Sequence, residues 1–182
     1  MEASHERTKL SMDELNRLEP AAFHQATKIP VIIVLDNIRS LHNVGSVFRS
    51  ADAFLVESIY LCGITATPPH REIQKTALGA TETVEWKYFE STDLAVAALK
   101  QQGFKIFCIE QTKESVFLQN MEMQATEKMA LIFGNEVNGV AQHIIDAADG
   151  CIEIPQFGSK HSFNISVSAG IVLWEVYKKM YL

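Results

Sequence analysis

Short apolar runs alternate along this chain with segments whose apolar residues recur every three or four positions. Continuous runs such as residues 30–35 and 129–133 are typical of parallel strands that are buried on both faces. This alternation predicts an α/β fold, with a mostly parallel six-stranded sheet covered by helices on both faces. The predicted strands span residues 30–35, 58–62, 84–89, 104–109, 129–133 and 151–154.

Segments with helical spacing connect the predicted strands. Val44, Val47 and Phe48 are spaced for a helix that follows the first strand. We expect Asn43 to lie near the N-cap of this helix and Arg49 to lie within it. Further helices are predicted over residues 72–78, 92–102, 140–148 and 162–181.

The first 28 residues are expected to form a leader, and residues 29–182 to form one domain. A short amphipathic helix is predicted over residues 11–23, because Ser11 and Glu14 have the spacing of a capping box. Pro20 should weaken the last turn of this helix. Its apolar positions are Met12, Leu15 and Leu18.

Length and composition favour a single buried core. The chain has 182 residues, of which 47% are hydrophobic, which is too short for two ordinary domains. Its longest apolar runs fall far short of the ~20 residues that cross a bilayer. The polar N-terminus has no apolar signal core. We therefore expect a cytoplasmic protein without a membrane partner.

The three cysteines are predicted to be small buried residues that stay reduced. Cys62, Cys108 and Cys151 each lie in or beside a predicted strand and have no CxxC spacing. A disulfide, a zinc site and a nucleophilic role are therefore disfavoured, and no metal is expected.

Net charge limits how this chain could contact nucleic acid. A formal charge of −6 argues against non-specific coating of nucleic acid, which lysine and arginine drive by displacing phosphate counterions. Any such contact must be local. The cationic residues in predicted loops or at helix ends are Arg39, Arg49, His70, Arg71, Lys75, Lys113, Lys160 and His161.

Three polar strings follow predicted strands, where open α/β proteins gather ligand-binding groups. A Rossmann fingerprint, a P-loop and a nucleophile elbow are all absent from the sequence, so an uncommon ligand site is favoured. The strings are Asn43-Val44-Gly45 with Arg49, Gly134-Asn135-Glu136 with Gly139, and Ser162-Phe163-Asn164 after Ile154-Pro155.

Each string also has a purely structural interpretation. Gly134 ends a buried strand, where a residue without Cβ lets the backbone approach a flat ligand such as adenine, but a plain turn is equally compatible. The start of the last helix offers free N–H groups near Asn164, although capping by Ser162 alone would explain it. Arg49 could be a solvated helix residue.

Taken in this order, the strings resemble the SpoU/TrmH branch of the SPOUT RNA methyltransferases. The resemblance covers the chain from about residue 30 to its C-terminus, with Phe163 and residues 156–161 departing from the usual pattern. It implies a C-terminal trefoil knot, a homodimer, bound S-adenosylmethionine and transfer of a methyl group to a ribose 2′-hydroxyl of RNA. Topology rules would not have predicted a knot.

The resemblance also implies roles for individual residues. Arg49 matches the arginine that acts in catalysis in this family, where it approaches cofactor held by the other subunit. The catalytic set implied is Arg49, Asn43, Glu136, Ser162 and Asn164. The cofactor-binding set implied is Glu110, Gln111, Gly134, Ile154, Ser162, Phe163 and Asn164. Expected RNA contacts are Arg39, Arg49, Arg71 and Lys160.

Transfer RNA is the substrate that we favour, and two alternatives stay open. One is a SPOUT enzyme that acts on ribosomal RNA or on a base. The other is a catalytically silent RNA-binding dimer, against which the presence of Arg49, Glu136 and Asn164 speaks.

Overall fold

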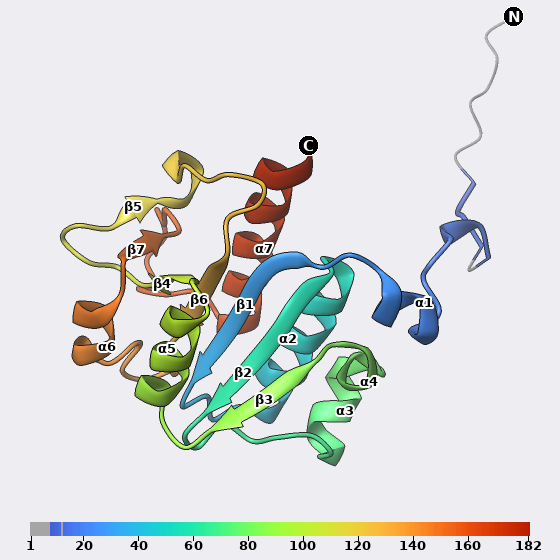
Figure 1. Cartoon of the computed structure of the whole chain (residues 1–182), viewed down its shortest axis with the longest axis horizontal. Coiled ribbons are helices and arrows are strands. Elements are labelled where there is room, and N and C mark those ends of the chain that lie inside the picture. The colour runs from blue at the N-terminus through green and yellow to red at the C-terminus, as the bar shows by residue number, and fades with distance from the viewer. Residues whose placement is uncertain (1–7, 12) are drawn as a thin grey trace, which may run out of the picture.

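A seven-stranded parallel sheet forms the centre of the molecule in a computed structural model, which describes residues 8–11 and 13–182 (Figure 1). The strands lie in the order β3-β2-β1-β6-β4-β7-β5, and all neighbouring pairs are parallel. Their bounds are β1 (Ile29–Asp36), β2 (Val56–Cys62), β3 (Trp86–Phe89), β4 (Lys105–Ile109), β5 (Val116–Phe117), β6 (Met129–Phe133) and β7 (Gly150–Glu153).

The predicted fold class is confirmed, but the predicted count of six strands is wrong. All six predicted strands are present, and β5 is the additional one. This strand has only two residues, both exposed, and it pairs with β7 at the edge of the sheet. A strand this short has no repeating apolar pattern that could reveal it.

Helices cover both faces of the sheet, as predicted (Figure 1). One face packs against α2, α3, α4 and α7, and the other packs against α5 and α6. No helix in residues 8–11 and 13–182 is long and apolar enough to span a bilayer. The helices are α1 (Pro20–Gln25), α2 (Leu41–Ala53), α3 (Arg71–Ala77), α4 (Ala80–Thr83), α5 (Thr92–Gln101), α6 (Gln142–Ala147) and α7 (Ile165–Tyr181).

The start of α7 differs from the prediction, whereas Asn43 lies close to the N-cap of α2, as predicted. The N-cap of α2 is Ser40, whose side chain accepts from the backbone N–H of Asn43, so Asn43 lies inside the first turn. The N-cap of α7 is Asn164, which accepts from the N–H of Ser166, and Ser162 lies before the helix. Neither Asn43 nor Ser162 caps its helix, so both side chains are available for other contacts.

The predicted leader helix over residues 11–23 is wrong. Ser11 and Glu14 do form the expected reciprocal hydrogen bonds, but they begin only a 3₁₀ turn, η1 (Asp13–Leu15). Pro20 then starts α1 instead of ending a helix, because a proline is well placed in a first turn that needs no N–H from it. Residues 1–7 and Met12 lie outside the described residues.

The strand order changes direction at the centre of the sheet. From β1 the chain moves outward through β2 and β3, and it returns to the other side of β1 with β4, β6 and β7. The loops after β1, β4, β6 and β7 therefore leave the same edge, close to the point of reversal. Open α/β sheets bind ligands at such a point.

The cysteines are unpaired and buried, as predicted. Burial raises the pKa of Cys62, and that of Cys108, to about 12. Both thiols therefore stay protonated at neutral pH and act as small apolar residues.

Gly45 lets α2 and α3 approach each other closely. A Cβ at this position would overlap the carbonyl oxygen of Ile73 and the hydroxyl of Thr76, which both belong to α3. We expect Gly45→Ala to lower the free energy of unfolding by about 1–3 kcal/mol, the usual cost of forcing a methyl group into packed structure. Urea denaturation of the purified variant measures this.

Gly158→Ala is the matched control, because an added Cβ there meets no described atom within 4 Å. Its stability should stay within about 0.5 kcal/mol of wild type. If Gly45→Ala were as stable as this control, close packing of α2 on α3 would not explain the glycine.

Candidate active site

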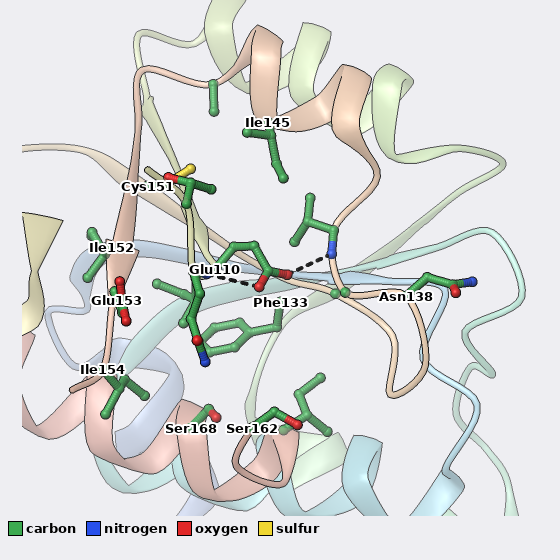
Figure 2. A pocket seen from close by; sticks show the side chains of 18 of the residues that line it. Glu110, Phe133, Asn138, Ile145, Cys151, Ile152, Glu153, Ile154, Ser162 and Ser168 are labelled. Atoms are coloured by element: carbon green, nitrogen blue, oxygen red, sulfur yellow. Dashed lines mark hydrogen bonds between the residues drawn. The ribbon is translucent and has the colours of Figure 1, made fainter. Parts of the chain in front are cut away.

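The loops at this edge of the sheet surround a cleft of about 1380 Å³ (Figure 2). It lies between the residues that follow β4 and β6 on one side, and β7 with the start of α7 on the other. Eight of the predicted site residues line it. They are Glu110, Gln111, Gly134, Glu136, Ile154, Ser162, Phe163 and Asn164.

A continuous chain of hydrogen bonds joins the three polar strings. The amide nitrogen of Asn43 donates to Glu136 at 3.1 Å, and its oxygen accepts from the amide nitrogen of Asn164 at 3.1 Å. Asn43 is 9% exposed, and both bonds are partly buried. Asn43 is thereby held beside Glu136, which is 93 positions away along the chain, and beside Asn164, which is 121 positions away.

Glu136 also fixes the loop that precedes α2. Its carboxylate accepts from the backbone N–H of Arg39 and from that of Ser40, each at 3.2 Å. Partial burial by itself raises the pKa of Glu136, but hydrogen bonds from backbone N–H groups and from Asn43 outweigh it and lower the pKa below its ordinary value. The side chain is therefore an anion at neutral pH.

The loop after β6 is closed tightly on itself. A Cβ on Gly134 would overlap the backbone of Gly139 and Val140, and the side chain of Asn135 accepts from the N–H groups of Val137 and Asn138. The turn itself therefore requires Gly134. Close approach of adenine to this glycine remains a prediction, although the residue does line the cleft.

Glu110 projects into the cleft from the end of β4 (Figure 2). Its carboxylate accepts from the N–H of Val140 at 3.1 Å and from that of Gln111 at 2.9 Å. The side chain of Gln111 in turn donates to the carbonyl oxygen of His161 at 2.8 Å. The loop after β4 is thus tied to both of the other loops that form the cleft.

Two aromatic residues of the loop after β7 are exposed. Phe163 is 41% exposed at the wall of the cleft, and Phe157 is 97% exposed nearby in the same loop. Lys160 is also exposed in this loop but does not line the cleft.

The predicted basic residues are not gathered in this cleft. Arg49 is exposed on α2 and lines a separate cavity of about 480 Å³ with Lys75 of α3. Arg71 is exposed at the start of α3. Arg39 is exposed and meets Glu136 only through its backbone. Within a single chain, therefore, the side chains of Arg49 and Glu136 belong to different cavities.

Sequence reasoning missed several residues of the cleft wall. Position is a signal for two of them, since Ile109 and Phe133 each end a predicted strand at the binding edge of the sheet. Among residues 8–11 and 13–182, no group of three or more histidine, cysteine, aspartate or glutamate side chains is arranged to hold a metal ion. The missed residues include Ile109, Phe133, Cys151, Ile152 and Ser168.

Comparison with known proteins shows which family this chain is similar to. The family model described as "SpoU rRNA Methylase family" matches residues 30–174. A tRNA (guanosine(18)-2′-O)-methyltransferase of Aquifex aeolicus is 33% identical over 155 residues, covering 82% of this chain and 69% of that protein. The 23S rRNA (guanosine-2′-O-)-methyltransferase RlmB of Neisseria meningitidis is 32% identical, covering 84% of this chain and 60% of that protein.

A solved structure shows the same fold. It is an AdoMet-bound rRNA methyltransferase from Sinorhizobium meliloti, with a TM-score of 0.78 and 23% identity over 88% of this chain and 61% of that chain. The chain thus spans only part of these relatives, about 60–69% of their lengths. Because the family model matches most of its residues, the chain belongs to the SpoU rRNA methylase family.

Proposed function

We propose that this protein is an S-adenosylmethionine-dependent methyltransferase that acts on a ribose 2′-hydroxyl of RNA. The observation that carries the proposal is the hydrogen-bond chain from Glu136 through Asn43 to Asn164, which unites the three family motifs at one cleft. The names of the relatives, enzymes of both tRNA and rRNA, support the reaction and leave both RNA classes open. We favour transfer RNA.

The cleft has the chemistry that S-adenosylmethionine needs. Partly exposed apolar side chains at the cleft, such as Ile109, Ile145 and Ile154, suit the adenine ring. Six carboxylates and one lysine are among the lining residues, so the cleft favours a ligand that carries positive charge. When bound, this cofactor supplies an electrophilic methyl group on a cationic sulfur. The residues proposed to hold it are Glu110, Gln111, Gly134, Ile154, Ser162, Phe163 and Asn164.

Transfer needs help at the ribose oxygen, because a hydroxyl is a weak nucleophile. With the cofactor bound, this oxygen would bond to the methyl carbon as the carbon–sulfur bond breaks; the electron pair would stay on sulfur, and the hydroxyl proton would pass to water. Arg49 would stabilise the negative charge that gathers on the oxygen and orient a neighbouring phosphate. A guanidinium does not readily lose its proton, so a role as general base is disfavoured.

A homodimer would bring Arg49 to the cleft of the partner subunit. Exposed aromatic residues near the end of α7 support such an interface, because Trp174 is 50% exposed and packs against Phe54 together with Tyr177. The same proposal includes the C-terminal trefoil knot, a leader of 28 residues before the catalytic domain, and a cytoplasmic location. The proposal also includes a catalytic role for Ser162 and RNA contacts by Arg39, Arg71 and Lys160.

Methyl transfer is tested with purified protein, radiolabelled S-adenosylmethionine and unmodified transcripts of transfer and ribosomal RNA. Arg49→Ala should bind S-adenosylhomocysteine as wild type does, while methyl transfer falls by about 10²-fold, a typical loss for a group that stabilises transition-state charge. Calorimetry measures the binding, and nucleoside analysis identifies the 2′-O-methyl product. Near-normal turnover would remove Arg49 from the mechanism.

Product analysis also separates the alternatives. A methylated base would point to a different SPOUT reaction. Binding of RNA without any binding of S-adenosylhomocysteine would favour the silent scaffold.

Mixed dimers test whether the active site is shared between subunits. Arg49→Ala and Asn164→Asp should each be inactive as homodimers; the aspartate keeps an oxygen to cap α7 but cannot donate to Asn43. Random pairing of the two variants should restore about a quarter of wild-type activity, because half of the dimers are mixed and each has one intact site. Co-refolding followed by the methyl-transfer assay measures this. No recovery would mean that both residues act in one protomer.

The role proposed for Glu136 predicts a pH dependence of stability. Its folded-state pKa is lowered, so its stabilising effect is present above the ordinary value of 4.5 and disappears as pH falls through the folded-state value. Glu136→Gln should therefore cost about 0.5–1.5 kcal/mol at neutral pH, a modest loss because the residue is exposed, and nothing in strong acid.

Urea denaturation over a series of pH values measures the difference. Glu90→Gln, an exposed residue after β3, is the matched control. An equal cost of Glu136→Gln at every pH would contradict the charge-dependent role.

A further inference from the structure

A second cavity lies between α2 and α3, outside the proposed cofactor cleft. Its volume is about 480 Å³, and it contains two cations, Arg49 and Lys75, with no acidic residue among its lining residues. The hydroxyls of Ser50 and Thr76 already donate to backbone carbonyls. Within the described chain, the side-chain hydrogen-bond donors left for a ligand here are therefore the two cationic groups and the hydroxyl of Ser46.

A carboxylate at the edge of this cavity already engages one of the cations. Glu72 accepts from the ammonium of Lys75 at 2.7 and 2.9 Å, and it lies 3.0 Å from the imidazole of His42. The hydrogen bonds from Lys75 and from His42 lower the pKa of Glu72, so this partner is an anion at neutral pH. Glu72 thus occupies a place that an external anion could take.

The two cations of the cavity have one further basic neighbour on α3, although the whole chain carries −6. Arg71 is exposed in the first turn of α3, one turn before Lys75. Surface pairs such as Lys75 with Glu72 are weak and exchange partners easily. A polyanion at this surface could therefore bind Lys75, once that lysine leaves Glu72, together with Arg49 in the same cavity.

We propose that the α2–α3 cavity binds a backbone phosphate of the RNA substrate, with Lys75 exchanging Glu72 for the phosphate. The proposal rests on the proposed function, which supplies RNA as the ligand. A phosphodiester suits the cavity because its two unesterified oxygens can accept from an ammonium and a guanidinium at once. Lys75 is then a positioning residue, since it fixes the backbone next to Arg49.

Two substitutions with opposite expected effects on RNA affinity test this assignment. Lys75→Ala should weaken binding of unfractionated transfer RNA by about threefold to tenfold, and should flatten the slope of log K against log salt by about 0.7–0.9, the value for one lost phosphate contact. Glu72→Gln should tighten binding by about twofold to threefold, because it removes the competing anion. If the pair only stabilised α3, both substitutions would weaken binding.

The measurement is filter binding with S-adenosylhomocysteine present, repeated over a range of salt concentrations and with a ribosomal RNA transcript. In the methyl-transfer assay, Lys75→Ala should raise the KM for RNA and leave that for S-adenosylmethionine unchanged. Lys87→Ala is the matched control, because Lys87 lies over the Tyr60 ring on the other face of the sheet. It should bind RNA within about twofold of wild type.

Three results would overturn the assignment. The first is a salt dependence of RNA binding that is the same in Lys75→Ala as in wild type. If the wild-type enzyme still methylates RNA, this result overturns only the phosphate site and leaves the proposed function unaffected. Dissociation of the dimer by Lys75→Ala, seen by light scattering, would assign the cavity to contact between copies of the chain. Failure of the wild-type protein to bind RNA at all would end both proposals.

Discussion

One buried amide holds this site together. Asn43 donates to Glu136 and accepts from Asn164 with the two ends of a single planar group. The two nearest substitutes fail, since an ionised aspartate cannot donate and glutamine is longer by one carbon. Its position in the first turn of α2, just beyond the cap at Ser40, places it between the other two loops. The relative positions of all three loops depend on this residue.

The molecule separates its charges into two surfaces. The charged residues that line the cleft at the end of the sheet are mostly carboxylates, whereas the cavity between α2 and α3 contains Arg49 and Lys75. The net charge of −6 is a property of the whole chain and does not give the local charge of either surface. Local fields decide which ligand each surface attracts, so a chain that is acidic overall can accommodate both a cation and a polyanion.

Patterns that repeat along the chain were predictable, and contacts between distant residues were not. Apolar runs located six strands and the parallel arrangement, but β5 has two residues and no pattern. Pro20 begins α1, whereas the sequence pattern predicts that it weakens the last turn of an earlier helix. Proline occurs at both ends of helices, and the neighbouring residues decide which end it marks. The motifs located Glu136 and Asn164, yet nothing in the spacing shows that both bond to Asn43. Likewise, helical spacing put Arg49 on α2 without showing which cavity it would reach.

The bond between Asn43 and Asn164 has a consequence for the order of folding. These residues are 121 positions apart, so the bond closes a loop that contains most of the chain. Contacts of such long range form late, after local structure and much of the sheet. During synthesis the early strands can pair while the cleft does not yet exist. An incompletely folded or truncated molecule can therefore have a native-like core and still be unable to bind a ligand.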